Sequence, residues 1–456
     1  MNRLILWDEW SKAFSHLRSA FSHQQTFLWA AIFCAGLSVR TNLRGVSSIV
    51  DCLGLNGRAY GSLCRLCASK AIDLDQLVRC WVRLCLKIFV PVCVDGYLVV
   101  FGDGIKIPKE GKKMPAVKLM HQSSQSNSKA EYIMGHYFQA LSLAVTTPQK
   151  DIVAVPLLAR IHDGLVLSNR SKKTVLNRFG DIIGEVVEAA QIPAIVVADA
   201  YYANASTLDE VDRTSCHLVS RVAHNTVAYF PAKKPKNRRR GRPAKKGAKV
   251  KLKKFFDCLD QSFEDYRYTC NDLYWPKAKK IIRFVIVEHA TKGRVILMSS
   301  KLDLDPITII RLYAKRWLIE CDFKSAVHQV GTFSYHFWMK DMKPTRRKTK
   351  QYLHRESESY RQRVKEKLNS FHVHVAFGCI TQGLMKHLAI NHSDATWRSF
   401  NGWLRTIRDD VKPSEVVVAN ALRSTLWNFL QSKQRLPAWA KFMLERIDPD
   451  RARMTA

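Results

Sequence analysis

Residues 311–330 have the sequence RLYAKRWLIECDFKSAVHQV, and the interpretation of the whole chain starts from this stretch. Four polar residues recur in it at intervals of three or four and would share one face of an α-helix: Tyr313, Arg316, Glu320 and Lys324. The apolar residues lie largely off this face, where they can pack against a core. Two interpretations are open. The stripe is either a solvated face with ordinary i,i+4 ion pairs, or a surface that presents one carboxylate, two cations and a phenol to an anionic ligand.

Length and composition indicate a large globular protein with an anionic partner. The chain has 456 residues, of which 47% are hydrophobic, so it can bury a sizeable core over about three domains. Its 73 Lys and Arg residues outnumber 39 Asp and Glu residues, which gives a formal net charge of +34. Such an excess favours a polyanion, most simply nucleic acid.

The apolar segments argue against a membrane protein. The longest apolar run, residues 27–39, has 13 residues, whereas a spanning helix needs about 20. It also starts too late, and lacks the cleavage pattern, for a signal peptide. The twelve cysteines are scattered through apolar segments, as is typical of a reducing compartment. We therefore expect a cytoplasmic protein without a membrane partner, and we disfavour a zinc site at Cys64, Cys67, Cys80 and Cys85 because no glycine knuckles surround them.

Residues 1–94 are expected to form a helical N-terminal DNA-binding region. Two short helical patterns, residues 41–55 and 58–68, flank a glycine turn, as in a helix-turn-helix. Arg44, Arg58 and Arg65 could reach phosphates from them. The alternative interpretation is a small helical bundle without DNA recognition.

Residues 95–222 are expected to form a mixed α/β unit. The apolar runs at residues 98–101, 137–145 and 152–158 predict an antiparallel meander, with Asp103 at the tip of its first strand. Residues 171–190 predict a helix with Ser171 as its N-cap. A buried strand, a second helix and a last strand are expected at residues 194–198, 202–211 and 216–222, with Asp199 directly after the buried strand.

Residues 223–300 are expected to interrupt this unit with a basic, β-rich insertion. Residues 233–254 contain 13 Lys or Arg and no acid, around the cluster Arg238, Arg239, Arg240 and Arg242. This Arg-Gly-Arg-Pro core resembles an AT-hook, which lies in the minor groove of A·T-rich DNA. The other interpretation, which we favour, is a solvated loop that holds any phosphate backbone. Strands are predicted at residues 266–268, 281–288 and 294–298, as a small β subdomain that emerges from the main fold.

Residues 301–390 are expected to complete the core, and residues 391–456 to form a helical C-terminal region. A second basic segment, residues 340–350, precedes a charged helix, and residues 371–388 predict an apolar helix that packs back on the sheet. A metal site at His372 and His374 is disfavoured, because residues two apart do not share a helical face. The C-terminal tryptophans are expected to pack in a core.

Three carboxylates, Asp103, Asp199 and Glu320, are the candidate catalytic residues. If the first and fourth core strands are neighbours, the two aspartates converge, and a helix that crosses the sheet can bring the glutamate. Three carboxylates so close repel one another unless a cation lies between them. Two Mg²⁺ ions about 3.5–4 Å apart would activate a water or a 3′-hydroxyl and stabilise the leaving oxygen of a phosphodiester.

These residues resemble a known family. The stretches VVFGDGIKIP, AIVVADAYYAN and YAKRWLIECDF are similar to those of DDE transposases of bacterial insertion sequences, in particular the IS-four-like branch. Tyr313, Arg316 and Glu320 match the first three members of that branch's signature Tyr-x2-Arg-x3-Glu-x6-Lys. The signature lysine position holds Val327, while Lys324, on the same helical face, stands four residues after the glutamate.

The resemblance implies a ribonuclease-H-like core and a transposase that binds the terminal inverted repeats of its own element. It would cleave DNA by hydrolysis and join the 3′-hydroxyl to target DNA, as a homodimer on paired ends and in the bacterial nucleoid. Asp103, Asp199 and Glu320 would bind Mg²⁺, with Mn²⁺ able to replace it, and Tyr313, Arg316 and Lys324 would contact phosphates. Two alternatives remain: a ribonuclease-H-like nuclease or resolvase without strand transfer, and a catalytically inactive domesticated DNA-binding protein.

Overall fold

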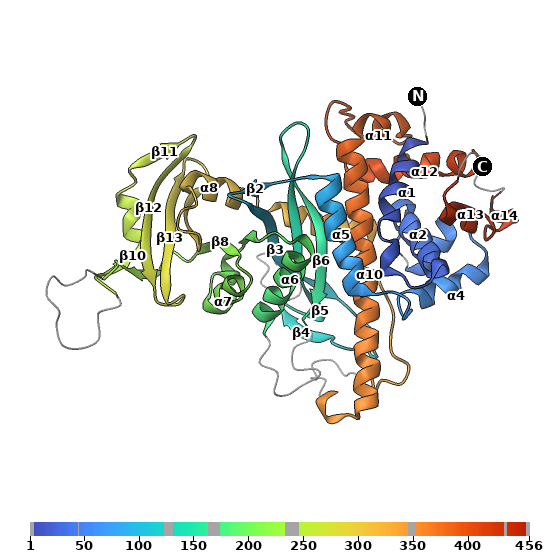
Figure 1. The fold of residues 1–456 in the computed structure, drawn as a ribbon, viewed down its shortest axis with the longest axis horizontal. Helices are drawn as coiled ribbons and strands as arrows, with labels where there is room; N and C mark the ends of the chain where they lie inside the picture. The colour runs from blue at the N-terminus through green and yellow to red at the C-terminus, as the bar shows by residue number, and fades with distance from the viewer. Residues whose placement is uncertain are drawn as a thin grey trace.

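The computed structural model describes residues 4–43, 45–122, 131–162, 174–232, 246–344, 353–432 and 436–452. Three parts follow one another along its longest axis in Figure 1: a β-rich part, a central sheet, and a helical part that contains both ends of the described chain. The four arginines 238, 239, 240 and 242 and the expected N-cap Ser171 lie outside the described residues.

The N-terminal region consists of helices, as expected. They are α1 (Ile5–Ser15), η1 (Arg18–Ala20), α2 (Gln24–Val39), α3 (Val46–Cys52), α4 (Gly57–Leu66) and α5 (Leu74–Ile88). Most residues of α2 are buried, because it is apolar on all sides and helices surround it. The pair α3 and α4 matches the expected short helices, and Arg58 and Arg65 are exposed on α4. The turn between them is partly covered, since Asn56 N–H donates to the Arg446 carbonyl.

The core sheet has the strand order β6-β5-β3-β7-β8. Its strands are β3 (Tyr97–Pro108), β5 (Tyr132–Thr146), β6 (Ile152–Ile161), β7 (Ala194–Ala198) and β8 (His217–Val222). The first three are antiparallel, while β7 runs parallel to β3, and β8 runs parallel to β7. Short strands flank them: β1 (Val90–Pro91), β2 (Cys93–Val94) and β4 (Lys118–His121). The predicted strands are confirmed, and the first and fourth are neighbours, which is the condition for the two aspartates to converge.

Alternate residues of β3 face opposite layers of the molecule. Leu98 and Val100 belong to the hydrophobic cluster that includes α6 (Val175–Ala190). Val99 and Phe101 belong to the cluster that includes Ile319 of the opposite layer. Thr174 caps α6, three residues after the expected cap. The helices η3 (Ala200–Tyr202) and α7 (Ala205–Arg213) connect β7 to β8.

The insertion extends the core sheet instead of forming a separate one. Its elements are β9 (Val227–Tyr229), β10 (Lys249–Lys251), η4 (Leu252–Asp257), β11 (Gln261–Phe263), β12 (Tyr266–Trp275), β13 (Lys280–His289) and β14 (Gly293–Ser299). The three predicted strands correspond to β12, β13 and β14. Because β14 pairs antiparallel with β8, the edge of the core sheet is covered and the sheet continues into the insertion.

The single helix expected at residues 311–330 is wrong. The chain forms α8 (Pro306–Ala314), a turn at residues 315–317, α9 (Leu318–Ser325) and the π-helical turn η5 (Ala326–Val330). Asp305 caps α8 by accepting from Thr308 N–H, and Pro306 stands in its first turn, where a missing N–H costs nothing. Both α8 and α9 pack on the face of the sheet that carries Phe101.

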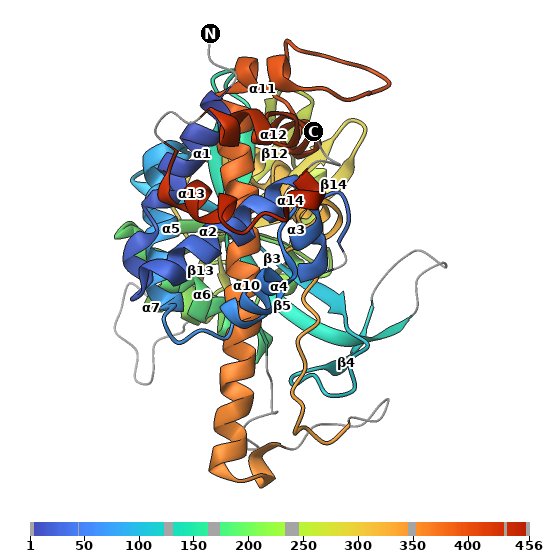
Figure 2. The ribbon, with the colours of Figure 1, turned by 90° about the vertical axis from the view of Figure 1, so that its right-hand side faces the viewer.

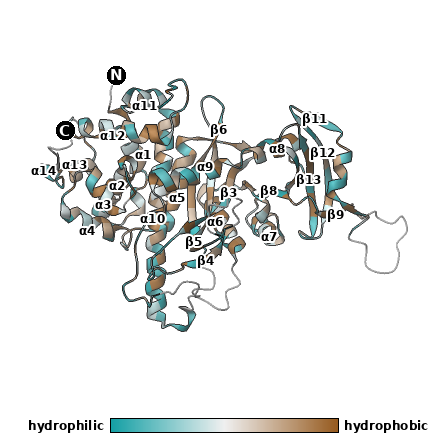
Figure 3. Cartoon of the chain, turned by 180° about the vertical axis from the view of Figure 1, so that it is seen from behind, coloured by the Kyte–Doolittle hydropathy of each residue, from teal (hydrophilic) through white to brown (hydrophobic). Residues whose placement is uncertain are grey.

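The longest helix, α10 (Glu358–Asn391), follows the short η6 (Leu353–Arg355) and runs through the height of the molecule in Figure 2. Its first part projects from the body and is mainly hydrophilic in Figure 3. From Leu368 onward most of its residues are buried, which agrees with the apolar helix predicted there.

The C-terminal helices pack against the N-terminal ones. They are α11 (Ser393–Ser399), α12 (Glu415–Gln431), α13 (Ala438–Leu444) and α14 (Pro449–Ala452). Trp439 stacks among Trp7, Trp10 and Phe429, as expected for a packing role, whereas Trp403 is 84% exposed. Within the described ranges, the helices lack the combined length and apolar character that crossing a bilayer requires.

Candidate active site

Asp103 lies inside β3, not at the tip of the first strand as the sequence suggested. The strand continues to Pro108 because its second half pairs with β5. Glycines flank the aspartate for steric reasons: a Cβ on Gly102 would come within 2.4 Å of the Phe179 ring, and one on Gly104 within 2.6 Å of the Tyr137 ring. Asp103 is partly buried, and its Oδ1 accepts from Gly104 N–H at 2.7 Å.

Asp199 is level with Asp103 on the neighbouring strand. The last paired residues of β3 and β7 are Gly102 and Ala198, so the next residue on each strand is an aspartate. The Asp199 side chain accepts from Tyr201 N–H at 2.9 Å, and its backbone carbonyl accepts from the Ser220 hydroxyl at 2.7 Å. The second contact ties the end of β7 to β8.

Arg316 joins Glu320 to this pair of strands. Its Nη1 is 3.2 Å from Asp103 Oδ2 and its Nη2 is 2.6 Å from Glu320 Oε1. The arginine lies in the turn between α8 and α9, and the glutamate in the first turn of α9. We call Asp103, Asp199, Arg316 and Glu320 the carboxylate site. It unites residues that are far apart in the sequence on one face of the sheet.

The two other predicted site residues, Tyr313 and Lys324, differ in how close they lie to the carboxylate site. Tyr313 is half-buried at the end of α8, and burial raises its pKa, although the nearby guanidinium groups of Arg221 and Arg316 lower it. Lys324 is exposed on α9 and forms no ion pair with the rest of the described chain. Three members of the stripe expected on one helical face, Tyr313, Arg316 and Glu320, therefore remain neighbours, whereas Lys324 lies apart from them.

The charges of the carboxylate site are not balanced. Burial and the Asp199 carboxylate raise the pKa of Asp103 from 3.8 to about 6, although Gly104 N–H and Arg316 lower it. Glu320 adds a further raising effect. Arg316 thus pairs with two of the three carboxylates, and Asp199 has no ion-pair partner among the described residues.

This donor set fits a hard divalent cation, which prefers carboxylate oxygens. Arg316 separates Asp103 from Glu320, so the three carboxylates are not all within 4.8 Å of one another. Two ions about 3.5–4 Å apart do not require that, because each ion has its own ligands. The residues present are compatible with divalent cation binding between the strands and α9.

Two supporting residues escaped the sequence interpretation. The buried hydroxyl of Tyr202 donates to Gln139 Oε1 at 2.6 Å, which fixes the turn after Asp199 to β5. Gln139, which lies among mainly apolar residues in the strand predicted at residues 137–145, was the available signal, since an amide that is buried with them needs a partner.

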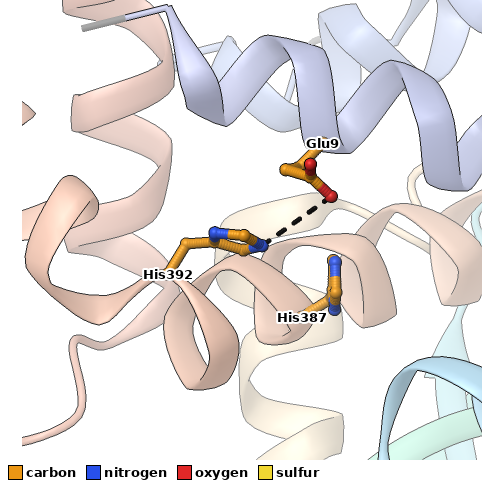
Figure 4. A group of neighbouring side chains, drawn as sticks. All are labelled: Glu9, His387 and His392. Carbon is orange, nitrogen blue, oxygen red and sulfur yellow. Dashed lines mark ion pairs between the residues drawn. The ribbon is translucent and has the colours of Figure 1, made fainter. Parts of the chain in front are cut away.

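A separate group, Glu9, His387 and His392, has ligand atoms within 4.8 Å of one another (Figure 4). Glu9 Oε2 lies 3.9 Å from His392 Nε2. The Asn391 amide donates to His387 Nδ1 at 2.8 Å and to the Ile88 carbonyl, so the proton of the neutral ring is on Nε2 and neither ring nitrogen has a free lone pair. We therefore interpret this group as a contact that attaches α1 to the end of α10.

Strand order, strand directions and the position of the aspartates define a ribonuclease-H-like core. The sequence model of the DDE superfamily endonucleases matches residues 16–265, more than half of the chain, and the chain belongs to this family. The matched residues include Asp103 and Asp199, whereas Glu320 lies beyond them. A comparison with curated proteins finds no match. The chain is therefore a DDE-type enzyme of the endonuclease class, for which DNA is the substrate and divalent cations are the usual cofactors.

Proposed function

We propose that this enzyme is a transposase of the IS-four-like branch. It binds the terminal inverted repeats of its element as a homodimer, cleaves the DNA by hydrolysis, and joins the 3′-hydroxyl to target DNA. The observation that supports this proposal most is the Arg316 guanidinium, which contacts Asp103 and Glu320 beside Asp199. The arginine and the glutamate of the Tyr-x2-Arg-x3-Glu spacing thus lie together in the carboxylate site.

Asp103, Asp199 and Glu320 would hold two Mg²⁺ ions, or Mn²⁺ in their place, which supply an activated nucleophile and stabilise the leaving oxygen. Arg316 pairs with two carboxylates and lies beside Tyr313, and its planar guanidinium has further N–H groups that can donate hydrogen bonds to a phosphate that approaches the site. Tyr313 donates to a neighbouring phosphate, and Lys324 contacts the backbone further along the exposed face of α9.

Other basic side chains would hold the duplex. The projecting part of α10, residues 338–340 and the turn between α4 and α5 line a groove with one acid, Glu366, and five cations: Lys70, Lys340, Arg363, Lys365 and Lys367. We assign phosphate contacts to Arg58 and Arg65 of α4 as well, and to Arg238, Arg239, Arg240 and Arg242 of the insertion. Alanine replacement of those four arginines should weaken the salt dependence of DNA binding, since each lost phosphate contact reduces the slope of log K against log salt by about 0.9.

The substitution Asp199→Asn tests the catalytic assignment. It should abolish cleavage of the element ends in Mg²⁺ and leave the affinity for the same DNA nearly intact, because only the cation ligand is lost. Asp209→Asn is the matched control, since Asp209 is an exposed carboxylate on α7. Undiminished cutting by the Asp199 variant in a gel assay would refute the proposal.

The reaction products distinguish a transposase from the two alternative functions. A nuclease or resolvase yields cut DNA and no joined strands, whereas a transposase yields both. A DNA-binding protein without catalysis keeps its salt-dependent affinity and shows no dependence on divalent cations.

A further inference from the structure

The inward face of α9 carries a second acidic residue, two positions after Glu320. Asp322 is 2% exposed and points away from the carboxylate site, because residues two apart lie on different sides of a helix. Its Oδ2 accepts from the Ser142 hydroxyl at 2.7 Å, and its Oδ1 is 3.0 Å from Lys386 Nζ. Its backbone carbonyl accepts from Gln382 at 3.1 Å. Helix α9 is thus held through both the side chain and the backbone of Asp322.

Ser142 connects this aspartate to the strands of the carboxylate site. It lies on β5 directly opposite Phe101 of β3, and Phe101 is two residues before Asp103. Residues opposite each other and residues two apart share one face of a sheet. The hydrogen bond from Ser142 to Asp322 therefore fixes the helix that carries Glu320 relative to the strand that carries Asp103.

Lys386 extends the connection to the C-terminal region. From α10 its Nζ also reaches Glu415 Oε1 at 2.9 Å, in the first turn of α12. We call Asp322, Lys386 and Glu415 the anchor triad. It links α9 to two helices outside the sheet.

Helix α9 needs such an anchor, because neither of its ends is held by continuous α-helix. A turn at residues 315–317 precedes it and the π-helical turn η5 follows it. Buried ion pairs usually add little stability over apolar packing of the same volume. Their directional contacts do fix one position of the helix, which apolar contacts alone leave free to slide.

We propose that Asp322, Lys386 and Ser142 are positioning residues, which set the distance of Glu320 from Asp103 and Asp199 for cation binding. This inference rests on the proposed function of the three carboxylates. Glu415 transmits the position of the C-terminal helix α12 to α9 through Lys386.

The test uses the full-length triple variant Asp322→Asn, Lys386→Met and Glu415→Gln, which removes all three charges and leaves none of them buried without a partner. We expect cleavage to fall about 10- to 100-fold, as is usual when groups that orient metal ligands are removed, with DNA affinity unchanged. Mn²⁺ affinity in the absence of DNA, measured by calorimetric titration, should fall by a similar factor, and the amides of α9 should exchange faster. The matched control is Arg160→Met with Glu185→Gln, a pair on β6 and α6 at 2.6 Å, which should leave all these quantities unchanged.

Ser142→Ala is the second variant, because it removes a hydrogen bond without moving a charge. It should lower Mn²⁺ affinity about tenfold and keep the wild-type thermal midpoint within a few degrees. Wild-type Mn²⁺ affinity in the Ser142 variant, or in a folded triple variant, would overturn the inference. Cleavage of DNA by the Asp199→Asn variant would overturn the proposed function. The Mn²⁺ affinities of the other variants test the positioning residues separately.

Discussion

The two faces of α9 carry charged groups that differ in how positive and negative charges are balanced. The carboxylate site, on the outer face, has three carboxylates and one guanidinium, and burial with the Asp199 charge raises the pKa of Asp103 to about 6. The anchor triad, on the inner face, has two carboxylates around one ammonium, with Lys412 within electrostatic range of both. One group of charges is left unbalanced and the other is nearly neutral.

This difference separates a binding role from a structural one. A buried cluster with balanced charge and short contacts has no need of a ligand, and breaking it exposes its partners to an apolar environment. A cluster with excess negative charge is unfavourable until a cation arrives. The same helix thus reserves one face for a ligand and uses the other to stay in place.

The largest expected effect comes from Glu320→Gln. The change keeps the shape of the side chain and removes a cation ligand, so DNA cleavage should fall on the order of 10³-fold or more, beyond the 10- to 100-fold expected for positioning residues. Single-turnover cleavage of end DNA measures it. Folding should be unaffected, and a variant that cuts within tenfold of wild type would place Glu320 outside the chemistry.

The next largest effect is a loss of folding stability when the anchor triad on the inner face of α9 is broken. Lys386→Met leaves Asp322 and Glu415 buried without their shared cation, and should lower the free energy of unfolding by about 3–5 kcal/mol. Urea unfolding followed by circular dichroism measures the loss. Lys324→Met on the exposed face of α9 is the control and should change stability by less than about 0.5 kcal/mol. Equal losses in both variants would mean that the anchor triad is not an anchor.

A smaller effect should follow from adding divalent cation. Mn²⁺ at ten times its dissociation constant should stabilise the free protein by about 1.4 kcal/mol, because it binds only the folded carboxylate site. Unfolding by urea with MnCl₂, compared with NaCl at equal ionic strength, gives the increment. Glu320→Gln should lose most of it, whereas Arg160→Met with Glu185→Gln should keep it. An increment that persists in the Glu320 variant would place the cation elsewhere.

The sequence was sufficient to predict that each aspartate follows a short apolar strand, but the pairing of those two strands, on which their convergence depends, is known only from the structure. Nor was the sequence sufficient for the strand boundaries. Residues 102–108 include two glycines, a lysine and a proline, which are poor strand formers, and they are extended only because β5 pairs with them. The pairing of β14 with β8 is equally non-local and leaves no periodic pattern.

The sequence did not predict the break between α8 and α9 or the anchor triad, and the reason is again that both depend on non-local contacts. Arg316 and Glu320 are in contact across the start of α9, so the spacing of a continuous helix persists although the helix is interrupted at residues 315–317. Asp322 and Lys386 are paired by tertiary packing between helices, and composition alone does not distinguish them from solvated charges. The lysine expected to complete the stripe, Lys324, is exposed.

The smallest effect tests the charge imbalance itself, through Asp103→Asn in the absence of divalent cations. Between pH 3.8 and about 6 the folded protein keeps a proton on Asp103 that the unfolded chain has released, so this residue makes the protein less stable as pH rises through that window. Asparagine does not titrate. The variant should therefore match wild type near pH 4 and exceed its free energy of unfolding by on the order of 1 kcal/mol at pH 7.5, because a raised pKa corresponds to about 1.4 kcal/mol per unit and solvent around the partly exposed carboxylate screens part of that. Urea unfolding at both pH values gives the difference, in which the contributions of all other titrating groups cancel. If Asp103→Asn instead destabilises the protein at pH 7.5 as Lys386→Met does, the carboxylate site is a second structural cluster, and the contrast between the two faces of α9 disappears.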